Sequence, residues 1–345
     1  MMTRGNRHSR HELFAPIGAE GQAKLASSRI AVVGCGALGS NAAGMLGRAG
    51  VGTAGAGLLR LIDRDYVEES NLQRQALFDS EDARHATPKA LAAARHLERI
   101  DARIRTEAIV RELNASSALA LLEGVDLIID GTDNFRTRFV INDAAVALER
   151  PWIYGAAVGS RGAVATILPG TTPCLRCLLE EVPAFGAAES CDTAGIITPL
   201  PALVASLQVA AAMKLIVSGE IERGVSTFDC WSGTRSFRNS LADVSRNGSC
   251  RSCGTRELPA LEEDSEQVVT LCGRNSVQLF SSLKGDLDSV ERRFIAMGRV
   301  HRSPQSVTAE IEEGCLTLFE DGRVIVEGTT DPLEAKSIVA RYLGG

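Results

Sequence analysis

A glycine-rich loop is the first feature of the sequence that suggests chemistry. The motif Gly34-x-Gly36-x-x-Gly39 follows a short β-branched run and precedes a stretch with helical spacing. Glycines at these positions let the backbone approach a phosphate, and the first turn of a helix offers unpaired N–H groups to an anion. Asp63 ends the next apolar run, where a ribose-binding carboxylate belongs. The pattern predicts a mononucleotide or dinucleotide site, and a tight turn without a ligand is the alternative.

Polar residues crowd the stretch that follows Asp63, with a second carboxylate, Asp65, and then an amide and an arginine, Asn71 and Arg74. A dehydrogenase needs only the first acid. Lys89 follows as the second residue of a helix that Thr87 is expected to cap. A cation there is disfavoured by about 0.3 to 1 kcal/mol unless an anion faces it. A triphosphate would be that anion, and a solvated lysine on an exposed first turn is the alternative.

Asp133 follows a strongly apolar run, residues 125–130, whose end lies at the carboxyl edge of the expected sheet. It either caps the helix expected over residues 135–148 or supplies a hard oxygen ligand to Mg²⁺. Arg74, Lys89 and Asp133 together form a charge clamp that suits nucleotidyl transfer better than hydride transfer.

Four cysteines come as two Cys-x-x-Cys pairs, the ligand spacing of zinc sites: Cys174, Cys177, Cys250 and Cys253. Four sulfur ligands leave no open position, so the zinc would be structural. Because 72 residues separate the two pairs, the metal would join the end of the first domain to its middle. A redox pair or free buried thiols are the alternatives.

A fifth cysteine, Cys191, stands apart in a segment rich in glycine and alanine, residues 186–197. The negative charge of the neighbouring Asp192 disfavours a thiolate, so nothing local activates Cys191 as a nucleophile. From its chemistry alone, Cys191 is an ordinary thiol.

These residues require a framework that brings the ends of several strands together. Apolar runs alternate with helical spacing along the first part of the chain, with strands expected at residues 29–33, 58–62, 103–110 and 125–130, and helices at 42–48, 87–99, 114–122 and 135–148. This alternation predicts an α/β fold with a Rossmann-like, doubly wound and mostly parallel sheet. Two further runs, residues 152–157 and 164–168, have no helix between them, which predicts an antiparallel extension.

The composition is that of a globular protein, with 345 residues, 45% hydrophobic and 23% charged residues, and a net charge of −6. The acidic balance argues against nucleic acid or an anionic membrane as the main partner. Prolines and polar residues interrupt the longest apolar stretch, residues 196–217, so we expect a buried helix and no membrane span. Nine cysteines in a chain that begins without a secretory signal favour the cytoplasm.

The chain divides into two expected domains, residues 1–257 and 266–345, joined by an acidic linker over residues 258–265. In the second domain, alternating apolar residues flank the two-residue turn Asp321-Gly322, which predicts a hairpin. A final helix is expected after Asp331-Pro332. The second domain is therefore a small α/β unit.

Taken in order along the chain, these motifs resemble the ThiF/MoeB/HesA family, the bacterial relatives of ubiquitin-activating enzymes. The resemblance covers about residues 7–256 and rests on Arg7-His8-Ser9-Arg10-His11, Gly34-x-Gly36-x-x-Gly39, Asp63-x-Asp65, Ser70-Asn71-Leu72-Gln73-Arg74-Gln75, Pro88-Lys89, Thr132-Asp133-Asn134, the two Cys-x-x-Cys pairs and Cys191-Asp192-Thr193-Ala194-Gly195. It implies an enzyme that uses ATP and Mg²⁺ to adenylate the C-terminal glycine of a ubiquitin-like sulfur-carrier protein, releasing pyrophosphate.

The resemblance also implies roles for single residues. Arg10 would reach the phosphates bound by the neighbouring subunit of a homodimer, and Asp133 would bind Mg²⁺. Cys191 matches the cysteine of the thiamin branch that forms a sulfur linkage to the carrier. The nucleotide contacts would come from Gly34, Gly36, Gly39, Asp63 at the ribose, Asp65, Asn71, Arg74 and Lys89 at the phosphates, Gln75 and Asn134.

Cys191 favours the carrier of the thiamin thiazole pathway, with the molybdopterin carrier as the alternative. A dehydrogenase and a non-catalytic, zinc-stapled scaffold that binds a ubiquitin-like protein are the rival functions. Residues 53–57 look like a short insertion that lengthens a loop. The second domain has no Cys-headed loop of the rhodanese type, so we expect no sulfurtransferase activity and assign it to docking of the carrier or of a sulfur donor.

Overall fold

The computed structural model of the protein describes residues 7–179, 194–232, 238–240, 245–262, 268–271, 275–280, 287–295, 299–303, 306–320 and 322–343. These residues belong to two compact units, Met1–Asp264 and Ser265–Gly345. Each unit has its own sheet and its own hydrophobic core.

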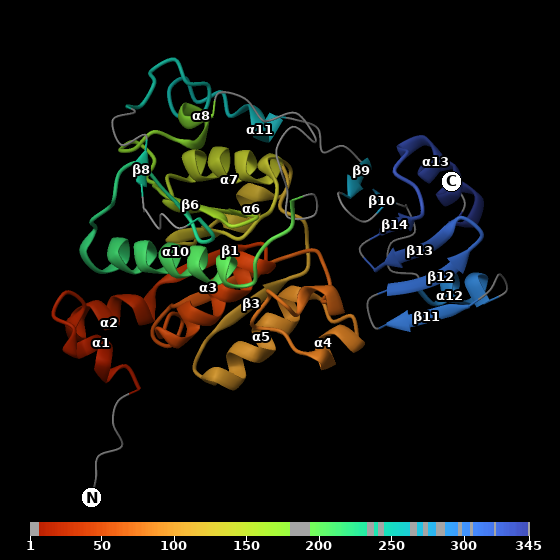
Figure 1. Ribbon diagram of the computed structural model, residues 1–345, viewed down its shortest axis with the longest axis horizontal. Helices are drawn as coiled ribbons and strands as arrows, with labels where there is room; N and C mark the ends of the chain where they lie inside the picture. The colour runs from red at the N-terminus through yellow and green to blue at the C-terminus, as the bar shows by residue number, and fades with distance from the viewer. Residues whose placement is uncertain are drawn as a thin grey trace, which may run out of the picture. The chain divides into compact units, whose positions relative to one another are not determined.

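The first unit is built on an eight-stranded sheet with the order β3-β2-β1-β4-β5-β6-β7-β8 (Figure 1). Its strands are β1 (Arg29–Val33), β2 (Leu58–Ile62), β3 (Thr106–Ile109), β4 (Leu127–Asp130), β5 (Trp152–Val158), β6 (Arg161–Ile167), β7 (Val225–Asp229) and β8 (Arg238–Ser240). The first five pair in parallel and the last three join antiparallel. The predicted fold class, including the antiparallel extension, is confirmed.

Helices cover both faces of this sheet (Figure 1). On one face the core contains α3 (Ala37–Arg48), α5 (Lys89–Ile100) and α10 (Pro199–Ser218). On the other it contains α6 (Ala118–Leu122), α7 (Phe135–Leu148) and α8 (Leu175–Leu178). Alternate residues of each strand face opposite layers, so a strand covered on both faces must be apolar throughout. That requirement explains the uninterrupted apolar runs of β1 and β4.

The longest helix, α10, passes the length and hydropathy criteria for a membrane span, and 39% of its apolar window is buried inside the described protein. It packs against α2 (Gly18–Ser27), α3, β5 and β6. Thr198 precedes Pro199 at the start of α10, and Gly219 ends the helix in the left-handed conformation. The predicted helix is therefore part of the core of the first unit.

Two short segments differ from a simple strand and helix alternation. The N-terminal helices α1 (Ser9–Leu13) and α2 precede the sheet and pack on each other. Residues 53–57 form a turn in which the Ala54 N–H donates to the Ala26 carbonyl oxygen and Arg105 donates to Gly55. The suspected insertion thus lies against the end of α2.

Part of the segment expected as a linker forms α11 (Pro259–Glu262), which packs against α7. The Ala260 N–H donates to Asp143 Oδ2 of α7 at 2.9 Å. The first unit therefore extends through this helix.

The second unit has a six-stranded antiparallel sheet with the order β11-β12-β13-β14-β10-β9. The strands are β9 (Val268–Leu271), β10 (Ser276–Phe280), β11 (Val300–Ser303), β12 (Ser306–Ile311), β13 (Gly314–Phe319) and β14 (Arg323–Glu327). Helix α12 (Leu287–Ile295) packs on β11 and β12, and α13 (Pro332–Leu343) packs on β9, β10 and β14. The hairpin between β13 and β14 is confirmed, with residues 320–322 between its strands; Asp321 itself lies outside the described residues.

Candidate functional site

The ends of three parallel strands meet at the glycine loop. The Gly34 N–H donates to the Ile62 carbonyl oxygen of β2 at 2.8 Å, and the Gly131 N–H donates to Val33 of β1 at 2.8 Å. Gly34 has a φ of +82°, and a Cβ on Gly39 would lie 1.7 Å from the Gly34 carbonyl oxygen. Glycine is thus required at both positions because the loop folds back tightly against the first turn of α3.

Asp63 lies directly beside this loop. Its Oδ2 accepts from the Cys35 N–H at 2.6 Å, and its Oδ1 accepts from the Asp65 N–H at 2.7 Å. Burial raises the pKa of Asp63, while the positive charge of Lys89 opposes that rise. Burial also raises the pKa of the Cys35 thiol well above its usual value, and the charge of Asp63 adds to this effect. Cys35 is therefore protonated and packed in the core.

Lys89 is only 5% exposed, at the first position of α5, and its Nζ lies 3.3 Å from Asp65 Oδ2. The alternative of a solvated lysine is wrong. The expected cap by Thr87 is also wrong, because Pro88 precedes the helix and no side chain caps it. Instead, the Lys89 N–H donates to the Asp65 carbonyl oxygen at 2.8 Å. Backbone and side chain together bring a buried cation next to Asp65 and Asp63.

Asp133 and Asn134 follow β4 at the same edge, and both are exposed. The Asn134 side chain caps α7 by accepting from the Thr137 N–H at 2.8 Å, so Asp133 is not the cap that was considered. The charge of Asp133 contributes to raising the pKa values of Arg64 and Arg138. The Asp133 carboxylate therefore lies near two cations and remains open to a ligand.

A buried ion pair lies beneath Asp133 and was missed by the sequence analysis. Arg138, 5% exposed on α7, donates to Asp130 Oδ2 at 3.1 Å and to the carbonyl oxygens of Thr132 and Gly155. Asp130 also accepts from the N–H and hydroxyl of Thr132. Burial raises the pKa of Asp130, opposed by the charge of Arg138. The pair fixes the turn that presents Asp133.

After Asp63 and Asp65, the segment between β2 and α5 carries three more of the residues that the family resemblance singled out. Asn71, at the end of the 3₁₀ helix η1 (Glu69–Asn71), is buried and takes part in a capping box with Glu68. The Asn41 side chain of α3 donates to the Arg74 carbonyl oxygen at 3.2 Å. Gln75 is buried, and its Oε1 has no hydrogen-bond partner among the residues that the structure describes. The segment therefore lies against the helix that follows the glycine loop.

One predicted site residue, on α1, does not join this group in the described part of the chain. Arg10 is exposed on α1, which packs against α2. Cys191 lies outside the described residues.

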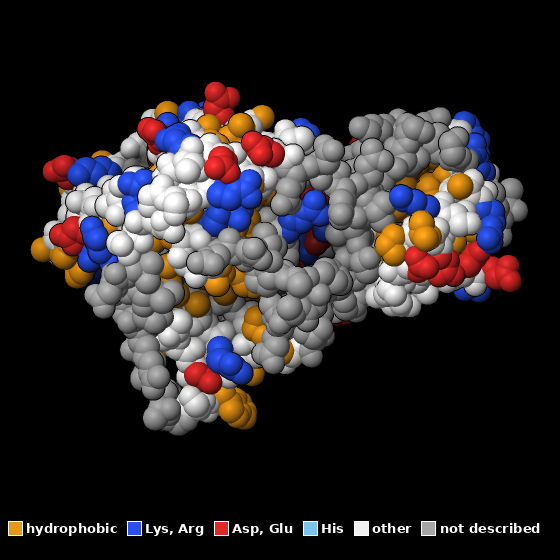
Figure 2. Space-filling model, turned by 90° about the horizontal axis from the view of Figure 1, so that it is seen from above, with side chains coloured by type: hydrophobic (Ala, Val, Ile, Leu, Met, Phe, Trp, Pro, Cys, Tyr) orange, Lys and Arg blue, Asp and Glu red, His pale blue; other side chains and the backbone are white. Residues whose placement is uncertain are grey.

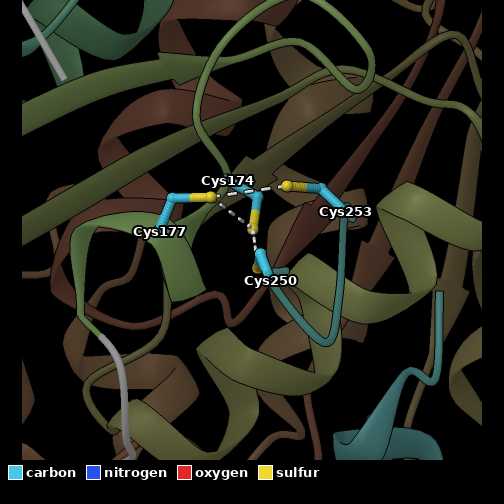
Figure 3. A group of neighbouring side chains, drawn as sticks. All are labelled: Cys174, Cys177, Cys250 and Cys253. Carbon is cyan, nitrogen blue, oxygen red and sulfur yellow. Dashed lines mark hydrogen bonds between the residues drawn. The ribbon is translucent and has the colours of Figure 1, made fainter. Parts of the chain in front are cut away.

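A second site is formed by the four cysteines of the two Cys-x-x-Cys pairs, whose sulfur atoms all lie within 4.8 Å of one another (Figure 3). Sγ–Sγ distances are 3.9 Å for Cys174–Cys177, 3.7 Å for Cys174–Cys250 and 3.4 Å for Cys177–Cys253. Zinc–sulfur bonds of about 2.3 Å in a tetrahedron place sulfurs about 3.8 Å apart. The donor set fits tetrahedral zinc, with no rearrangement of the chain.

Electrostatics in the cysteine cluster also suit a cation. Burial raises the pKa of Cys174 and Cys177. Burial acts in the same direction at Cys250, but hydrogen bonds from the N–H groups of Cys253 and Ser252 and from the Cys174 and Cys177 side chains together lower that pKa. A bound cation would offset the mutual repulsion of thiolates in this cluster.

Side chains behind the cysteines tie the two knuckles to α7. The Ser252 hydroxyl donates to Asp143 Oδ1 and accepts from Arg176 Nε, while Arg176 also stacks over the Phe139 ring at 4.7 Å. Asn142 accepts from the Leu175 N–H at 2.8 Å. This network orients both cysteine pairs without contributing a ligand, a support that metal sites commonly have.

The surface of the first unit carries charges of both signs. On the face shown in Figure 2, Lys and Arg side chains alternate with Asp and Glu side chains, with apolar side chains between them.

Comparison with known proteins identifies relatives of the chain. The model of the ThiF family matches residues 8–252. A protein of Bacillus subtilis (strain 168) named sulfur carrier protein ThiS adenylyltransferase is 42% identical over 342 residues, which cover 98% of this chain and 99% of that protein. A sulfur carrier protein adenylyltransferase of Thermus thermophilus is 37% identical over 256 residues, covering 72% of this chain and 90% of the relative.

Solved structures share the fold of the chain. The crystal structure of E. coli MccB with ATP matches with a TM-score of 0.61 and 23% sequence identity, over 73% of this chain and 75% of MccB. At this identity the likeness concerns the fold alone.

Proposed function

Because the chain belongs to the ThiF family, we propose that it adenylates the C-terminal glycine of a ubiquitin-like sulfur-carrier protein, with the ThiS carrier of the thiamin pathway as its substrate. The observation that carries this proposal is the 42% identity with a ThiS adenylyltransferase over 98% of the chain. The relative extends through both units, so the proposal applies to the whole chain.

In the proposed reaction, the terminal carboxylate of the carrier attacks the α-phosphorus of ATP. A carboxyl–phosphate bond forms, the bond to the β-phosphate oxygen breaks, and pyrophosphate leaves with both bonding electrons. Both reactants are anions, so catalysis consists mainly of alignment and charge neutralisation, and no general base is needed. The buried cation Lys89 and the guanidinium of Arg74 are suited to the second task.

The nucleotide would lie along the glycine loop, with its phosphates over the N-terminus of α3. Asp63 would hold the ribose, since each of its oxygens accepts one backbone hydrogen bond and keeps a second lone pair. Asn71, Arg74 and Lys89 would contact the phosphates, and Asp65, Gln75 and Asn134 would complete the contacts. The unpartnered Gln75 Oε1 supports this placement, because buried acceptors rarely remain without a donor.

Asp133 would bind Mg²⁺ together with the phosphates, because an exposed carboxylate at the strand edge is a ligand that Mg²⁺ prefers. When bound, the ion would neutralise charge on the departing pyrophosphate. Arg138 and Asp130 support this role by fixing the turn before Asp133.

The cysteine cluster would hold one structural zinc ion through Cys174, Cys177, Cys250 and Cys253. The support is the tetrahedral spacing of the sulfurs and the absence of a fifth, open position in that donor set. The ion would hold the segment after β6 against the segment after β8.

Arg10 would act on the phosphates of a neighbouring subunit, which requires a homodimer. Support comes from the apolar helix α10, whose apolar window is 39% buried within one chain, and from the exposed apolar residues Leu13 and Phe14 beside Arg10. Cys191 would form the sulfur linkage to the carrier after adenylation, in the cytoplasm. The second unit would help to dock the carrier or a sulfur-donor protein.

The test is ATP–pyrophosphate exchange with purified carriers. We expect exchange that depends on ThiS with an intact terminal glycine, and none with a ThiS that lacks this residue. The carrier of the molybdopterin pathway serves as the comparison. Binding of ThiS without exchange would support a scaffold instead, and faster exchange with the molybdopterin carrier would reassign the pathway.

A further inference from the structure

The residues between β2 and α5 form an arm that leaves the sheet and returns to it at one point. Tyr66 and Pro88 pair as an antiparallel bridge, and the Val67 N–H donates to the Thr87 carbonyl oxygen at 2.9 Å. Residues 66–88 therefore form a long loop whose two ends are paired with each other beside the Asp65–Lys89 contact. We call this loop the arm.

The near part of the arm is held against the first unit by neutral contacts. Asn41 of α3 donates to the Arg74 carbonyl oxygen, and Phe78 is buried in the core that contains α3, α5 and α10. Thr198 donates to Gln73 Oε1 at 3.0 Å. These contacts position the backbone around Arg74 but leave the far part of the arm, α4 (Ser80–Arg84), to be fixed separately.

A fully buried carboxylate, Asp82, fixes this far part to α5. Oδ1 of Asp82 pairs with Arg95, and Oδ2 lies 2.6 Å from His96 Nε2 and accepts from the Asp79 N–H at 3.1 Å. The Asp82 carbonyl oxygen also accepts from the Thr87 N–H at 2.9 Å. Both oxygens of Asp82 are therefore used for anchoring.

The two helix residues that hold Asp82 belong to the helix that begins at Lys89. The ionic contact thus connects the segment with Arg74 to the helix with Lys89, the two cations assigned to the same phosphates. Asp79, Asp82 and His96 lie close enough to share a metal ion. The Arg95 contact and the capping of α4 already account for the Asp82 carboxylate, so these residues are explained as an anchor.

We propose that Asp82, through Arg95 and His96, is a positioning residue for ATP: it holds the arm at the distance from α5 at which Arg74 and Lys89 engage one triphosphate. This inference rests on the proposed function. Asp82 is fully buried and both its carboxylate oxygens are engaged within the protein, so its loss should weaken ATP binding while leaving the chemical step at saturating ATP intact.

The test compares Asp82→Asn with Glu81→Gln. Both remove one negative charge from α4, but Glu81 is exposed and, among the residues that the structure describes, its side chain pairs with Arg84 and His85 of the same segment. In ThiS-dependent exchange, Asp82→Asn should raise KM for ATP by about tenfold or more, as expected for a lost charged hydrogen bond. kcat at saturating ATP and KM for ThiS should stay within about twofold. Glu81→Gln should match the wild type.

ATP affinity measured by calorimetry on the same samples distinguishes a failure of the proposed adenylation function from a failure of the role proposed for Asp82. A wild type that binds ATP but shows no exchange contradicts the proposed function, while the affinities of the variants still test Asp82. An unchanged KM and affinity for ATP in Asp82→Asn, or a fall in kcat alone, overturns the role of Asp82.

Arg95→Gln is the second variant, in case Asp82→Asn does not fold. Arg95 is 44% exposed, so its replacement is tolerable, and it removes one of the two anchors on α5. We expect a rise in KM for ATP of about threefold. An ATP KM equal to that of the wild type would contradict the proposal independently.

Discussion

Lys89 binds Asp65 twice: its Nζ lies 3.3 Å from Asp65 Oδ2, and its backbone N–H donates to the Asp65 carbonyl oxygen at 2.8 Å. The side-chain contact accounts for a lysine that is almost fully buried at the positive end of a helix, a position that disfavours a cation. The backbone contact does not involve the Lys89 side chain, so we expect it to persist in a neutral, non-proline variant, which makes the charge experimentally separable from the fold.

Lys89→Met should therefore keep the fold and lose the activity. We expect a fall in kcat/KM for ThiS-dependent ATP–pyrophosphate exchange of about 100-fold to 1,000-fold, as for other preorganised charge-stabilising groups. Circular dichroism should show an unchanged spectrum. Lys24→Met, at an exposed lysine of α2, is the matched control. Full exchange in Lys89→Met would remove Lys89 from the site.

Metal content tests the cysteine cluster. The purified protein should contain one zinc per chain, and Cys253→Ser should lose that zinc together with at least about 3 kcal/mol of unfolding free energy. Cys230→Ser should retain the metal, because Cys230 belongs to the same unit but not to the cluster. Absence of zinc from the wild type, with four titratable thiols in its place, contradicts the assignment.

The buried pair of Arg138 and Asp130 predicts an asymmetric stability effect. Arg138→Leu leaves the Asp130 carboxylate buried without its cation and should lower the free energy of unfolding by about 3 to 5 kcal/mol. Adding Asp130→Asn to that variant should recover part of the loss. Arg136→Leu, at an exposed position of α7 two residues before Arg138, should change stability by less than about 1 kcal/mol. Urea denaturation measures all of these, and equal effects of the two arginine replacements would refute the pairing.

Acid sensitivity should depend on Asp101. The Arg103 guanidinium bonds to it and lowers the pKa of Asp101 to about 2, despite opposing burial, and Arg7 adds a contact at 3.5 Å. A carboxyl with a depressed pKa stabilises the fold above its unfolded pKa of about 4, and this contribution disappears as the pH falls toward 2. The upper limit is about 2.5 kcal/mol; both arginines are half-exposed, so we expect about 1 kcal/mol.

Asp101→Asn should accordingly be less stable than the wild type at pH 7, and the difference in unfolding free energy should narrow between pH 4 and pH 2. Glu20→Gln, which removes an exposed pair with Lys24, serves as the control. A stability difference that is independent of pH across this window would show that the pair does not act through its charge.

The second unit can be removed to test its assignment to docking. The second unit has its own core, and α11 is bonded to α7 as part of the first unit. A chain that ends at residue 264 should therefore remain folded. We expect a KM for ThiS at least about tenfold higher, with an unchanged KM for ATP, because the lost contacts concern only the carrier. An unchanged KM for ThiS means that the second unit serves another purpose.

The parallel strands were predictable because burial on both faces demands continuous apolar residues. Val33 and Asp130 end such runs, and both strand ends lie at the site as expected. The antiparallel pairing of β5 and β6 was predictable because no helical stretch separates these two apolar runs. By contrast, α4 and η1 are short and polar, and local capping boxes of Asp79 with Asp82 and of Glu68 with Asn71 hold them, so hydrophobic periodicity does not indicate them.

Side-chain environments were the least predictable feature of the site. The sequence around Lys89 is compatible with either a solvated or a buried side chain. The contact between Lys89 and Asp65, which forms where the arm returns to the sheet, decides between these alternatives. Arg138 carries a charge on the first turns of a helix, where exposure is the usual outcome. In the sequence, only the spacing of eight residues between Asp130 and Arg138 hints at their pairing. Predicting the pair from this spacing requires knowing that α7 packs over β4.

The distance along the chain between the two cysteine pairs has a consequence for biosynthesis. The first pair leaves the ribosome 72 residues before the second, a delay of roughly 4 to 15 s at bacterial elongation rates. During that interval a nascent chain contains only two of the four sulfur ligands of this site. Closure of the metal centre is thus a late event in translation, and a ribosome stalled before Cys250 holds an adenylation domain that cannot yet be completed.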